Sequence, residues 1–516
     1  MFGKVYSAQL SFLSAHIVHI EVDLSRGLYS FSIVGLPDKA VEEARDRISA
    51  AIKNSGFKSP KNKNQKVVIS LAPAELKKEG SLFDLPMALA YLLASEDVSF
   101  SPEKRLFLGE LSLDGTLRKI QGALPLVEKA KREGFTEVFL PKDNAREAAF
   151  VRNIKIFGVR NLKEVAEHLE EKKEKQKKFL IEPQKETAIV FENAPQKITF
   201  GDIKGQEGAK RGLEIAAAGG HNIAMYGPPG TGKTMLAKAF CGILPPLSRE
   251  DIFEVTSIHS ATGILKDDLL IHPPFRAPHH TSSYVSLIGG GTIPKPGEVT
   301  LAHNGVLFLD EFPEFESRVI DSLREPLEER VARVSRARGS VQFPAKFILI
   351  AAMNPCPCGY FGVKGKSCVC RPADILRYKR KISGPIIDRI DLWVEVANIG
   401  HEKLMEKGEG VDYGETARKR VLHAREIQEK RFKSLNLQLK TNSELGPRSI
   451  VNHISLDTSV KKVLDDAARR FDLSPRMYHR IIKVARTIAD LEPSENIKEE
   501  HLFEALQYRP KQEERG

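Results

Sequence analysis

The chain has 516 residues, 41% of them hydrophobic, so it is long enough to build two or three domains with their own cores. It contains five cysteines and no pattern of a secretion signal, which argues against a framework of disulfides. No apolar run is long enough to span a bilayer, so we expect a soluble, cytoplasmic protein without membrane contacts. The formal net charge of +11 suits a nucleic-acid partner, although solubility alone also accounts for such a bias.

A highly charged stretch divides the chain. The run EKKEKQKKFLIEPQKE, residues 171–186, ends in a proline-containing passage, as linkers do. Before it, apolar runs such as KVVISLAP alternate with helical patterns, which indicates a compact α/β domain. We predict an α/β domain over residues 1–170, a linker over 171–197, a parallel-sheet core over 198–399 and a helix-rich domain over 400–516.

The segment NIAMYGPPGTGKTMLAKAF places a glycine-rich loop between an apolar strand and a helix. Its glycines allow successive backbone N–H groups to turn toward phosphate, and the helix start adds its positive dipole end. Lys233 is expected to reach the β- and γ-phosphates of ATP, and Thr234 to bind Mg²⁺. We expect nucleotide to be bound by Gly227, Pro228, Pro229, Gly230, Thr231, Gly232, Lys233 and Thr234.

Two later apolar runs end in polar residues. GVLFLDE ends in Asp310, expected to hold Mg²⁺ beside the nucleotide, and Glu311, expected to orient the attacking water. FILIAAMNP ends at Asn354, which a neighbouring strand would deliver to the γ-phosphate; the alternative is an asparagine that forms a turn before Pro355. Together with the phosphate loop, these residues predict a site of nucleotide hydrolysis.

Four of the five cysteines lie in CPCGYFGVKGKSCVC, as two Cys-x-Cys pairs separated by nine residues. Glycines between the pairs allow the loop to fold back, and four thiolates form the closed ligand set of a structural zinc site. We predict Zn²⁺ bound by Cys356, Cys358, Cys368 and Cys370. Reduced thiols in a basic loop and an iron–sulfur cluster are the alternatives.

Taken together, long motifs over nearly the whole chain resemble AAA+ ATPases, and more narrowly the magnesium-chelatase-like ComM (YifB) family. They are GPPGTGKT, FRAPHHTSS, GGGTIPKPGEVTLAHNGVLFLDE, AAMNPCPCGY, KISGPIIDRIDL and SPRMYHRIIKVARTIADL. The resemblance implies an α/β AAA+ core with a parallel sheet and a helical lid at the C-terminus. It also implies a ring-forming, ATP-driven DNA motor that promotes branch migration during recombination and natural transformation. Single-stranded and branched DNA, and recombination proteins, are the implied partners.

The same resemblance carries over to arginines near the end of the core and in the lid. Arg389, in SGPIIDRIDL, looks like the arginine finger that reaches the nucleotide of the next subunit. Arg476, in LSPRMYHR, looks like the second sensor of the γ-phosphate, with Arg480 as the alternative. A finger that acts between subunits requires head-to-tail contacts that close, so a hexameric ring is expected.

Basic residues before the Asn354 strand are candidates for DNA contact. REPLEERVARVSRARGSVQFPAKF predicts two short strands around a basic tip with Arg333, Arg336 and Arg338, and related ring ATPases project a hairpin here into the pore. Guanidinium groups would hold backbone phosphates without reading sequence. The alternative is a solvated turn. Lys295, in GGGTIPKPG, is a candidate for a second pore loop.

The first domain resembles the protease domain of Lon in KKEGSLFDLPMALA and FLGELSLDGTLRKIQGALPLVEKA. The serine and lysine of the protease dyad fall on Leu82 and Leu124, with Ser81 one residue away, so we predict no peptidase activity. Two functions compete with the DNA motor: a magnesium-chelatase-type or protein-remodelling motor that acts on a protein partner, and an ATP-dependent protease.

Overall fold

The fold is described from a computed structural model. It describes residues 1–172, 180–191, 198–291, 294–336, 339–363, 365–399 and 413–510. The chain forms two compact units: unit 1 comprises Met1–Val190 and Ile252–Leu270, and unit 2 comprises Phe191–Asp251 and Ile271–Gly516. Among the described residues, no helix has both the length and the apolar character needed to cross a membrane.

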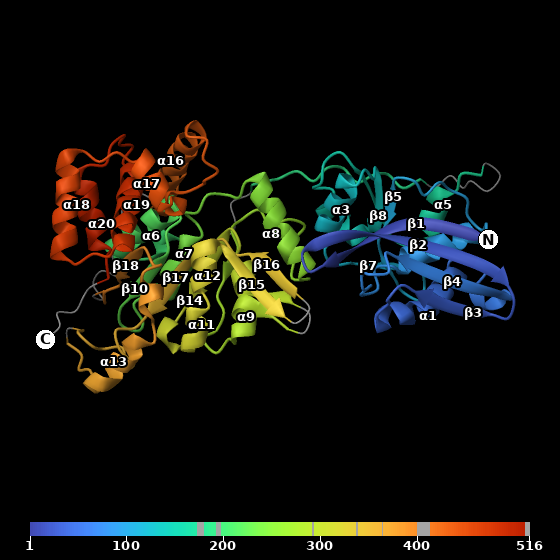
Figure 1. The fold of residues 1–516 in the computed structure, drawn as a ribbon, viewed down its shortest axis with the longest axis horizontal. Helices are drawn as coiled ribbons and strands as arrows, with labels where there is room; N and C mark the ends of the chain where they lie inside the picture. Colours follow the sequence, from blue (N-terminus) through green and yellow to red (C-terminus); the bar gives the residue numbers. More distant parts are fainter. Residues whose placement is uncertain are drawn as a thin grey trace. The chain divides into compact units, whose positions relative to one another are not determined.

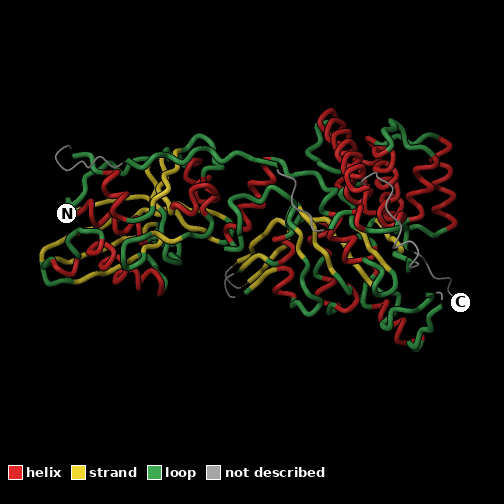
Figure 2. The backbone as a smooth tube through the Cα atoms, turned by 180° about the vertical axis from the view of Figure 1, so that it is seen from behind, coloured by secondary structure: helices red, strands yellow, loops and turns green. Residues whose placement is uncertain are grey.

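Unit 1 is built on a seven-stranded mixed sheet with the order β3-β4-β2-β1-β5-β8-β9 (Figures 1 and 2). Its strands are β1 (Phe2–Ser11), β2 (Ser14–Arg26), β3 (Ser30–Val34), β4 (Gln65–Ala72), β5 (Arg105–Phe107), β8 (Glu137–Pro141) and β9 (Lys155–Val159). β1, β2 and β4 are antiparallel neighbours, whereas β1, β5, β8 and β9 are parallel neighbours. A separate hairpin joins β6 (Glu110–Leu111) and β7 (Leu117–Arg118).

Helices cover this sheet. They are α1 (Lys39–Asn54), α2 (Asp84–Ala94), α3 (Ala123–Arg132), α4 (Ala145–Ala148) and α5 (Leu162–Leu169). The apolar α2 is buried along almost its whole length, and its backbone lies so close to β1 that a Cβ at Gly3 would be 2.6 Å from the carbonyl oxygen of Ala90. A larger residue at position 3 would clash with α2, so the close contact between β1 and α2 requires glycine there.

A segment from the middle of the sequence completes unit 1. Most of α8 (Arg249–Ala261) groups with this unit, although the sequence assigned it to the core over 198–399. The Gly122 backbone N–H donates to the Ser260 side-chain oxygen at 3.0 Å, and the Ser260 hydroxyl donates to the buried carboxylate of Glu147. Burial raises the pKa of Glu147, and its hydrogen bonds from Ser260 and Leu124 oppose that shift.

Unit 2 contains a parallel five-stranded sheet with the order β11-β14-β17-β10-β18. Its strands are β11 (Phe275–Arg276), β14 (Gly305–Leu309), β17 (Phe347–Met353), β10 (Ile223–Tyr226) and β18 (Leu392–Glu395). Successive residues of one strand enter different cores: Phe308 packs in the core shared with the C-terminal helices, and Leu307 in the core on the other face. A sheet covered on both faces explains why these strands are continuous apolar runs.

Many helices and two small hairpins surround this sheet. The helices of the first part are α6 (Glu207–Gly219), α7 (Lys233–Phe240), α9 (Tyr284–Ile288), α10 (Glu298–Leu301), α11 (Ser317–Asp321), α12 (Arg324–Glu329), α13 (Pro372–Arg380) and α14 (Gly384–Ile387). The hairpins pair β12 (Gly289–Gly290) with β13 (Lys295–Pro296), and β15 (Val331–Arg336) with β16 (Gly339–Pro344). The predicted hairpin after the Glu311 segment is thus present.

The C-terminal part of unit 2 is helical. It contains α16 (Tyr413–Ser434), α17 (Pro447–His453), α18 (Thr458–Arg470), α19 (Pro475–Leu491) and α20 (Glu499–Gln507). α16 lies against α6, where the side-chain amide of Gln428 donates to the Ala218 carbonyl at 3.0 Å. The mixed α/β architecture, with a parallel-sheet core and a helical C-terminal region, agrees with the fold predicted from the sequence.

A buried polar network connects the start of β10 with the approach to β18 and with α19. The two ring nitrogens of His221 contact Asp391 Oδ2 at 3.2 Å and Thr487 Oγ1 at 2.8 Å. Burial lowers the pKa of His221, while the Asp391 carboxylate opposes that shift. The histidine is therefore kept neutral inside the folded unit.

We expect the free energy of unfolding of unit 2 to fall as the pH drops below 6.5, the ordinary pKa of histidine. The unfolded chain then takes up a proton at His221 that the folded chain does not, at a cost of up to about 1.4 kcal/mol per pH unit. Denaturant unfolding followed by the fluorescence of Trp393, the single tryptophan of the chain, measures this slope. His221→Gln should remove the contribution and the exposed His16→Gln should retain it; equal slopes in both variants would contradict the assignment.

Candidate active site

The phosphate loop lies where the sequence predicts it, between β10 and α7. Gly230 and Gly232 have φ values of +78° and +89°, which is the left-handed region that glycine adopts without strain. Gly227 is required for another reason, because a Cβ there would lie 2.1 Å from the carbonyl oxygen of Val396. The loop is thus shaped by its glycines, and the start of α7 follows directly at Lys233.

Lys233 is buried within this loop. Its ammonium group donates to the carbonyl oxygens of Gly227 at 2.8 Å and Pro228 at 2.7 Å, and to Asn354 Oδ1 at 3.2 Å. Burial lowers the pKa of Lys233, and the nearby carboxylate of Asp310 opposes the shift. A phosphate group would offer this buried cation a stronger charge-assisted partner than neutral carbonyl oxygens do.

The residues predicted to hold Mg²⁺ lie together. The Thr234 hydroxyl donates to Asp310 Oδ2 at 2.7 Å, and the backbone N–H of Glu311 donates to Asp310 Oδ1 at 3.0 Å. A hydroxyl and a carboxylate oxygen are the hard ligands that Mg²⁺ prefers, and they lie beside the loop that would carry the phosphates. These residues therefore fit a nucleotide-bound Mg²⁺, for which Thr234 and Asp310 would supply the protein oxygens.

His280 contacts the predicted catalytic carboxylate. Its Nδ1 lies 3.0 Å from Glu311 Oε2, and its ring packs against that of His279 with centroids 4.2 Å apart. The pair lies in the FRAPHHTSS motif, whose local sequence indicates no role for either histidine. The signal that could have found it is position: His280 follows β11, and β11 is the sheet neighbour of β14, which ends next to Glu311.

The structure also brings together the arginines expected to sense phosphate. Arg389 Nη1 donates to the Pro385 carbonyl at 2.7 Å, and its Nη2 contacts the carboxylate of Glu328. Arg476 Nη2 contacts the other oxygen of Glu328 at 2.8 Å. Glu328 is a residue that sequence reasoning missed, because the two contacts span 61 and 148 residues of sequence.

Arg480, the alternative second sensor, is placed differently. Its guanidinium is buried and donates to the backbone carbonyls of Ile387, at 3.1 Å, and Ile390. These carbonyls flank Arg389, so Arg480 ties α19 to the backbone around the predicted finger. The Arg476 side chain is 56% exposed, which leaves it the more accessible of the two to a phosphate group.

The four clustered cysteines converge. The Sγ atom of Cys356 lies 3.4 Å from that of Cys358 and 3.7 Å from that of Cys368, and all four Sγ atoms lie within 4.8 Å of one another. Tetrahedral zinc with Zn–S bonds of about 2.3 Å needs sulfur atoms about 3.8 Å apart, so the ligand set Cys356, Cys358, Cys368 and Cys370 fits zinc. Backbone N–H groups, that of Tyr360 first, lower the pKa of Cys358 to about 6, whereas the pKa values of Cys368 and Cys370 are raised within the same cluster.

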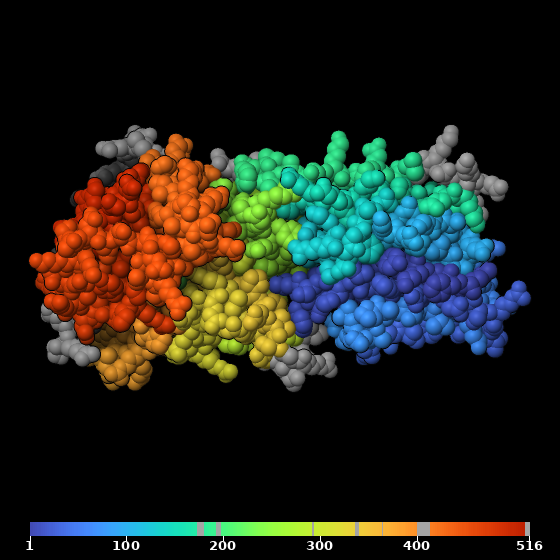
Figure 3. All heavy atoms as spheres, turned by 45° about the horizontal axis from the view of Figure 1, so that its top comes forward, coloured from blue at the N-terminus to red at the C-terminus, as the bar shows by residue number. Residues whose placement is uncertain are grey.

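The cysteine loop projects from the body of unit 2 together with α13 (Figures 1 and 3). It also contacts the phosphate loop, because a Cβ on Gly359 would lie 2.6 Å from Pro229 Cδ. Gly359 has a φ of +83°, so both its conformation and its surroundings favour glycine. The loop that carries the cysteine cluster therefore packs against the phosphate loop at Pro229.

The candidates for DNA contact are only partly described. Arg333 lies in β15, and its guanidinium pairs with Glu325 and with Glu329 at 2.6 Å. Arg336 ends β15, with its side chain outside the described residues, and Arg338 lies outside them entirely. Lys295 is exposed in β13 and pairs across the strands with Gly290. Arg333 thus has two acidic partners within its own chain, in exposed ion pairs that contribute little.

The positions of the Lon dyad carry no catalytic pair. Leu124, at the lysine position, is fully buried. Ser81, next to Leu82 at the serine position, donates its hydroxyl to the carboxylate of Glu110. The lysine close to it in sequence, Lys78, is itself buried and donates to the Pro73 carbonyl. The lack of peptidase activity stays a prediction, which incubation with an unfolded protein substrate would test.

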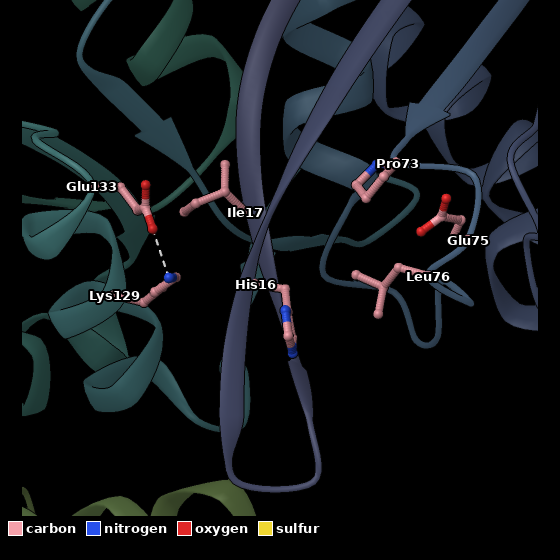
Figure 4. A pocket seen from close by; sticks show the side chains of 7 residues that line it. All are labelled: His16, Ile17, Pro73, Glu75, Leu76, Lys129 and Glu133. Atoms are coloured by element: carbon pink, nitrogen blue, oxygen red, sulfur yellow. Dashed lines mark hydrogen bonds and ion pairs between the residues drawn. The ribbon is translucent and has the colours of Figure 1, made fainter. Parts of the chain in front are cut away.

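Unit 1 has a hollow of about 410 Å³ beside the turn between β1 and β2 (Figure 4). His16 lies between the Lys129–Glu133 ion pair, at 2.6 Å, and the loop that carries Glu75 and Leu76. The lining side chains include no hydroxyl nucleophile and mix both signs of charge. The hollow therefore offers no set of groups typical of an active site.

Three family models match the chain. Residues 199–404 match "Magnesium chelatase, subunit ChlI", residues 20–144 match "Subunit ChlI of Mg-chelatase", and residues 412–509 match "Magnesium chelatase, subunit ChlI C-terminal". Together they cover the phosphate loop, part of the sheet of unit 1 and the C-terminal helices. The chain thus has the core of a magnesium-chelatase-like AAA+ ATPase.

Individual relatives extend the match to full length. The chain is 42% identical to "Competence protein ComM" of Haemophilus influenzae over 514 residues, which cover 98% of this chain and 97% of that protein. It is 41% identical to "Uncharacterized protein YifB" of Escherichia coli over 96% of this chain and 95% of that protein. A shorter match, 33% identical to "Lon protease 2" of Bacillus subtilis, covers 26% of this chain and 25% of that protein, and it confirms the Lon-like character of the first domain. The chain belongs to the ComM/YifB family of magnesium-chelatase-ChlI-like AAA+ proteins.

Proposed function

We propose that this protein is an ATP-driven DNA motor that forms a hexameric ring in the cytoplasm and promotes branch migration in homologous recombination and natural transformation. The observation that carries the ATP-dependent part is the assembled set of Lys233, Thr234, Asp310 and Glu311 at one end of the parallel sheet. The DNA-directed part is supported by full-length similarity to a protein named for competence and by the net charge of +11.

Each residue of the site has a distinct task in this proposal. Lys233 holds the β- and γ-phosphates, and Thr234 and Asp310 hold Mg²⁺, which offsets charge on the phosphates when bound. Glu311 accepts a proton from the attacking water, while His280 fixes the direction of its carboxylate. Asn354 contributes a polar side chain beside Lys233. Arg389 and Arg476 stabilise negative charge on the transferring phosphoryl group.

Two accessory parts complete the proposal. The cysteine cluster binds a structural Zn²⁺ and stiffens the loop that packs on Pro229. Arg333, Arg336, Arg338 and Lys295 hold DNA phosphates in the pore, and Arg333 also pairs with two carboxylates of its own chain. The domain predicted over residues 1–170, which in the structure extends to Val190 and includes Ile252–Leu270, serves as a scaffold for the ring formed by the core and the lid over 400–516.

The experiment that tests this function is ATP-dependent migration of a labelled three- or four-strand DNA junction. Wild-type protein should move the junction, and Glu311→Gln should not, because an amide cannot accept the proton of the attacking water. Glu316→Gln is the matched control, since this acid follows Glu311 by five residues and lies at the start of α11. Wild-type protein that hydrolyses ATP without moving any junction would contradict the DNA motor.

A second function is favoured by the family models. All three matched segments are described as parts of a magnesium-chelatase subunit, so a motor that acts on a protein partner shares the same core. In that case a partner protein, and not DNA, should stimulate ATP hydrolysis. Measuring ATPase rates with single-stranded DNA, branched DNA and no DNA distinguishes the two functions.

A further inference from the structure

One carboxylate holds both of the arginines proposed to act on the γ-phosphate. Glu328 Oε1 accepts from Arg476 Nη2 at 2.8 Å, and Oε2 accepts from Arg389 Nη2. The three residues come from α12, from the segment before β18, and from the first turn of α19. Elements that are distant in sequence therefore meet at a single side chain.

The backbone around Arg389 is fixed without this carboxylate. Arg480 holds two carbonyl groups on either side of Arg389, as described above. Earlier in the same segment, the hydroxyl of Ser383 donates to Asp321 Oδ1 at 2.7 Å and accepts from Arg324 at 3.0 Å. The Arg389 guanidinium itself is held by the Pro385 carbonyl at 2.7 Å and by Glu328, which is its charged partner among the described residues.

The charges of Glu328, Arg389 and Arg476 do not sum to zero. A single carboxylate faces two guanidinium groups, so one positive charge remains for another anion. The Nε–H of Arg389 is buried and has no hydrogen-bond partner among the described residues. Buried donors without a partner are rare, and a ligand or a water molecule that completes them is one cause. A phosphoryl oxygen has the charge and the acceptor capacity that this cluster lacks.

We propose that Glu328 is the positioning residue of the phosphate-sensing arginines, which it holds as one preorganised pair. The inference rests on the proposed roles of Arg389 and Arg476 in ATP hydrolysis, and it is independent of whether DNA is the substrate. Because α12 leads through Arg330 directly into β15, the same helix also forms the base of the basic hairpin (Figure 1).

The test is the ATPase activity of full-length Glu328→Gln without DNA. Glutamine keeps the shape of the side chain but removes the charge, so the arginines lose charge-assisted hydrogen bonds, and kcat should fall about tenfold. KM for ATP should change less than about twofold, because nucleotide binding uses the phosphate loop. Glu329→Gln is the matched control, because it removes the same charge from the same helix. Glu329 pairs with Arg333 at 2.6 Å and, among the described residues, forms no ion pair with either sensing arginine, so this change should leave kcat unchanged.

A double-mutant cycle separates positioning from a general structural effect. If Glu328 acts through both arginines, adding Glu328→Gln to the variant that carries Arg389→Ala and Arg476→Ala should change the residual rate of labelled phosphate release by less than about twofold. Wild-type kcat in Glu328→Gln, or an equal loss in both backgrounds, would overturn the proposal. A failed junction assay with these ATPase results intact would count against the DNA motor alone.

Discussion

Replacement of Lys233 by alanine is expected to abolish ATP hydrolysis, with a loss of at least about a hundredfold in kcat/KM. The ammonium group is buried within the phosphate loop by Gly227, Pro228 and Asn354 before phosphate arrives, and a phosphate group offers it a stronger partner than those neutral oxygens. Its removal takes away the positive charge that would face the phosphates. It also removes the hydrogen bonds that order the loop. Steady-state ATPase assays and titration with a fluorescent ATP analogue measure the two effects.

The matched control for this change is Lys238→Ala. Lys238 lies on the same helix α7 but is exposed, so its replacement by alanine retains the helix and removes one charge. Its ATPase activity should stay within about twofold of wild type, since exposed charges contribute little. Retained hydrolysis in Lys233→Ala would show that the phosphates bind elsewhere.

Replacement of Cys356 by serine is expected to remove one zinc ion per chain and to weaken ATP binding. Cys356 is buried and its sulfur lies within 3.7 Å of two other cluster sulfurs, so its loss opens the closed ligand set. The loop would then lose its order, and Gly359 would no longer support Pro229 in the phosphate loop. Changes at residues that orient a site through another group cost roughly 10- to 100-fold, so ATP affinity should fall by about tenfold or more.

Zinc content is measured by elemental analysis of protein prepared without chelators, and affinity by titration with the ATP analogue. Cys241→Ser is the control, because Cys241 is the one cysteine outside the cluster and follows α7 directly. It should retain full zinc content. Wild-type protein that carries no zinc would contradict the predicted site, and zinc loss with unchanged affinity would contradict its support of the phosphate loop.

The parts of the site that could be predicted from sequence are those with local causes. The phosphate loop is set by glycines, a strand and a helix within one short segment, and Asp310 and Glu311 follow a continuous apolar strand. The spacing of the cysteines likewise limits how they can converge. Neighbouring residues thus carried enough information for both predictions.

Other parts depend on contacts between distant segments. Nothing around Glu328 indicates that it will meet Arg476, which lies 148 residues away in sequence. His280 meets Glu311 because β11 and β14 are neighbours in the sheet, and strand order is a property of the whole fold. The grouping of α8 with unit 1 has the same origin, since its packing partners lie more than a hundred residues earlier.

That grouping affects the order in which the protein can be made and how it can be divided. Since unit 1 includes Ile252–Leu270, a ribosome must synthesise the phosphate loop before the first unit has all its parts. A fragment that stops in the linker would leave the buried Glu147 carboxylate without the Ser260 hydroxyl. Unit 1 is therefore a discontinuous folding unit, and a protease cut between residues 190 and 252 would not release it as an independent domain.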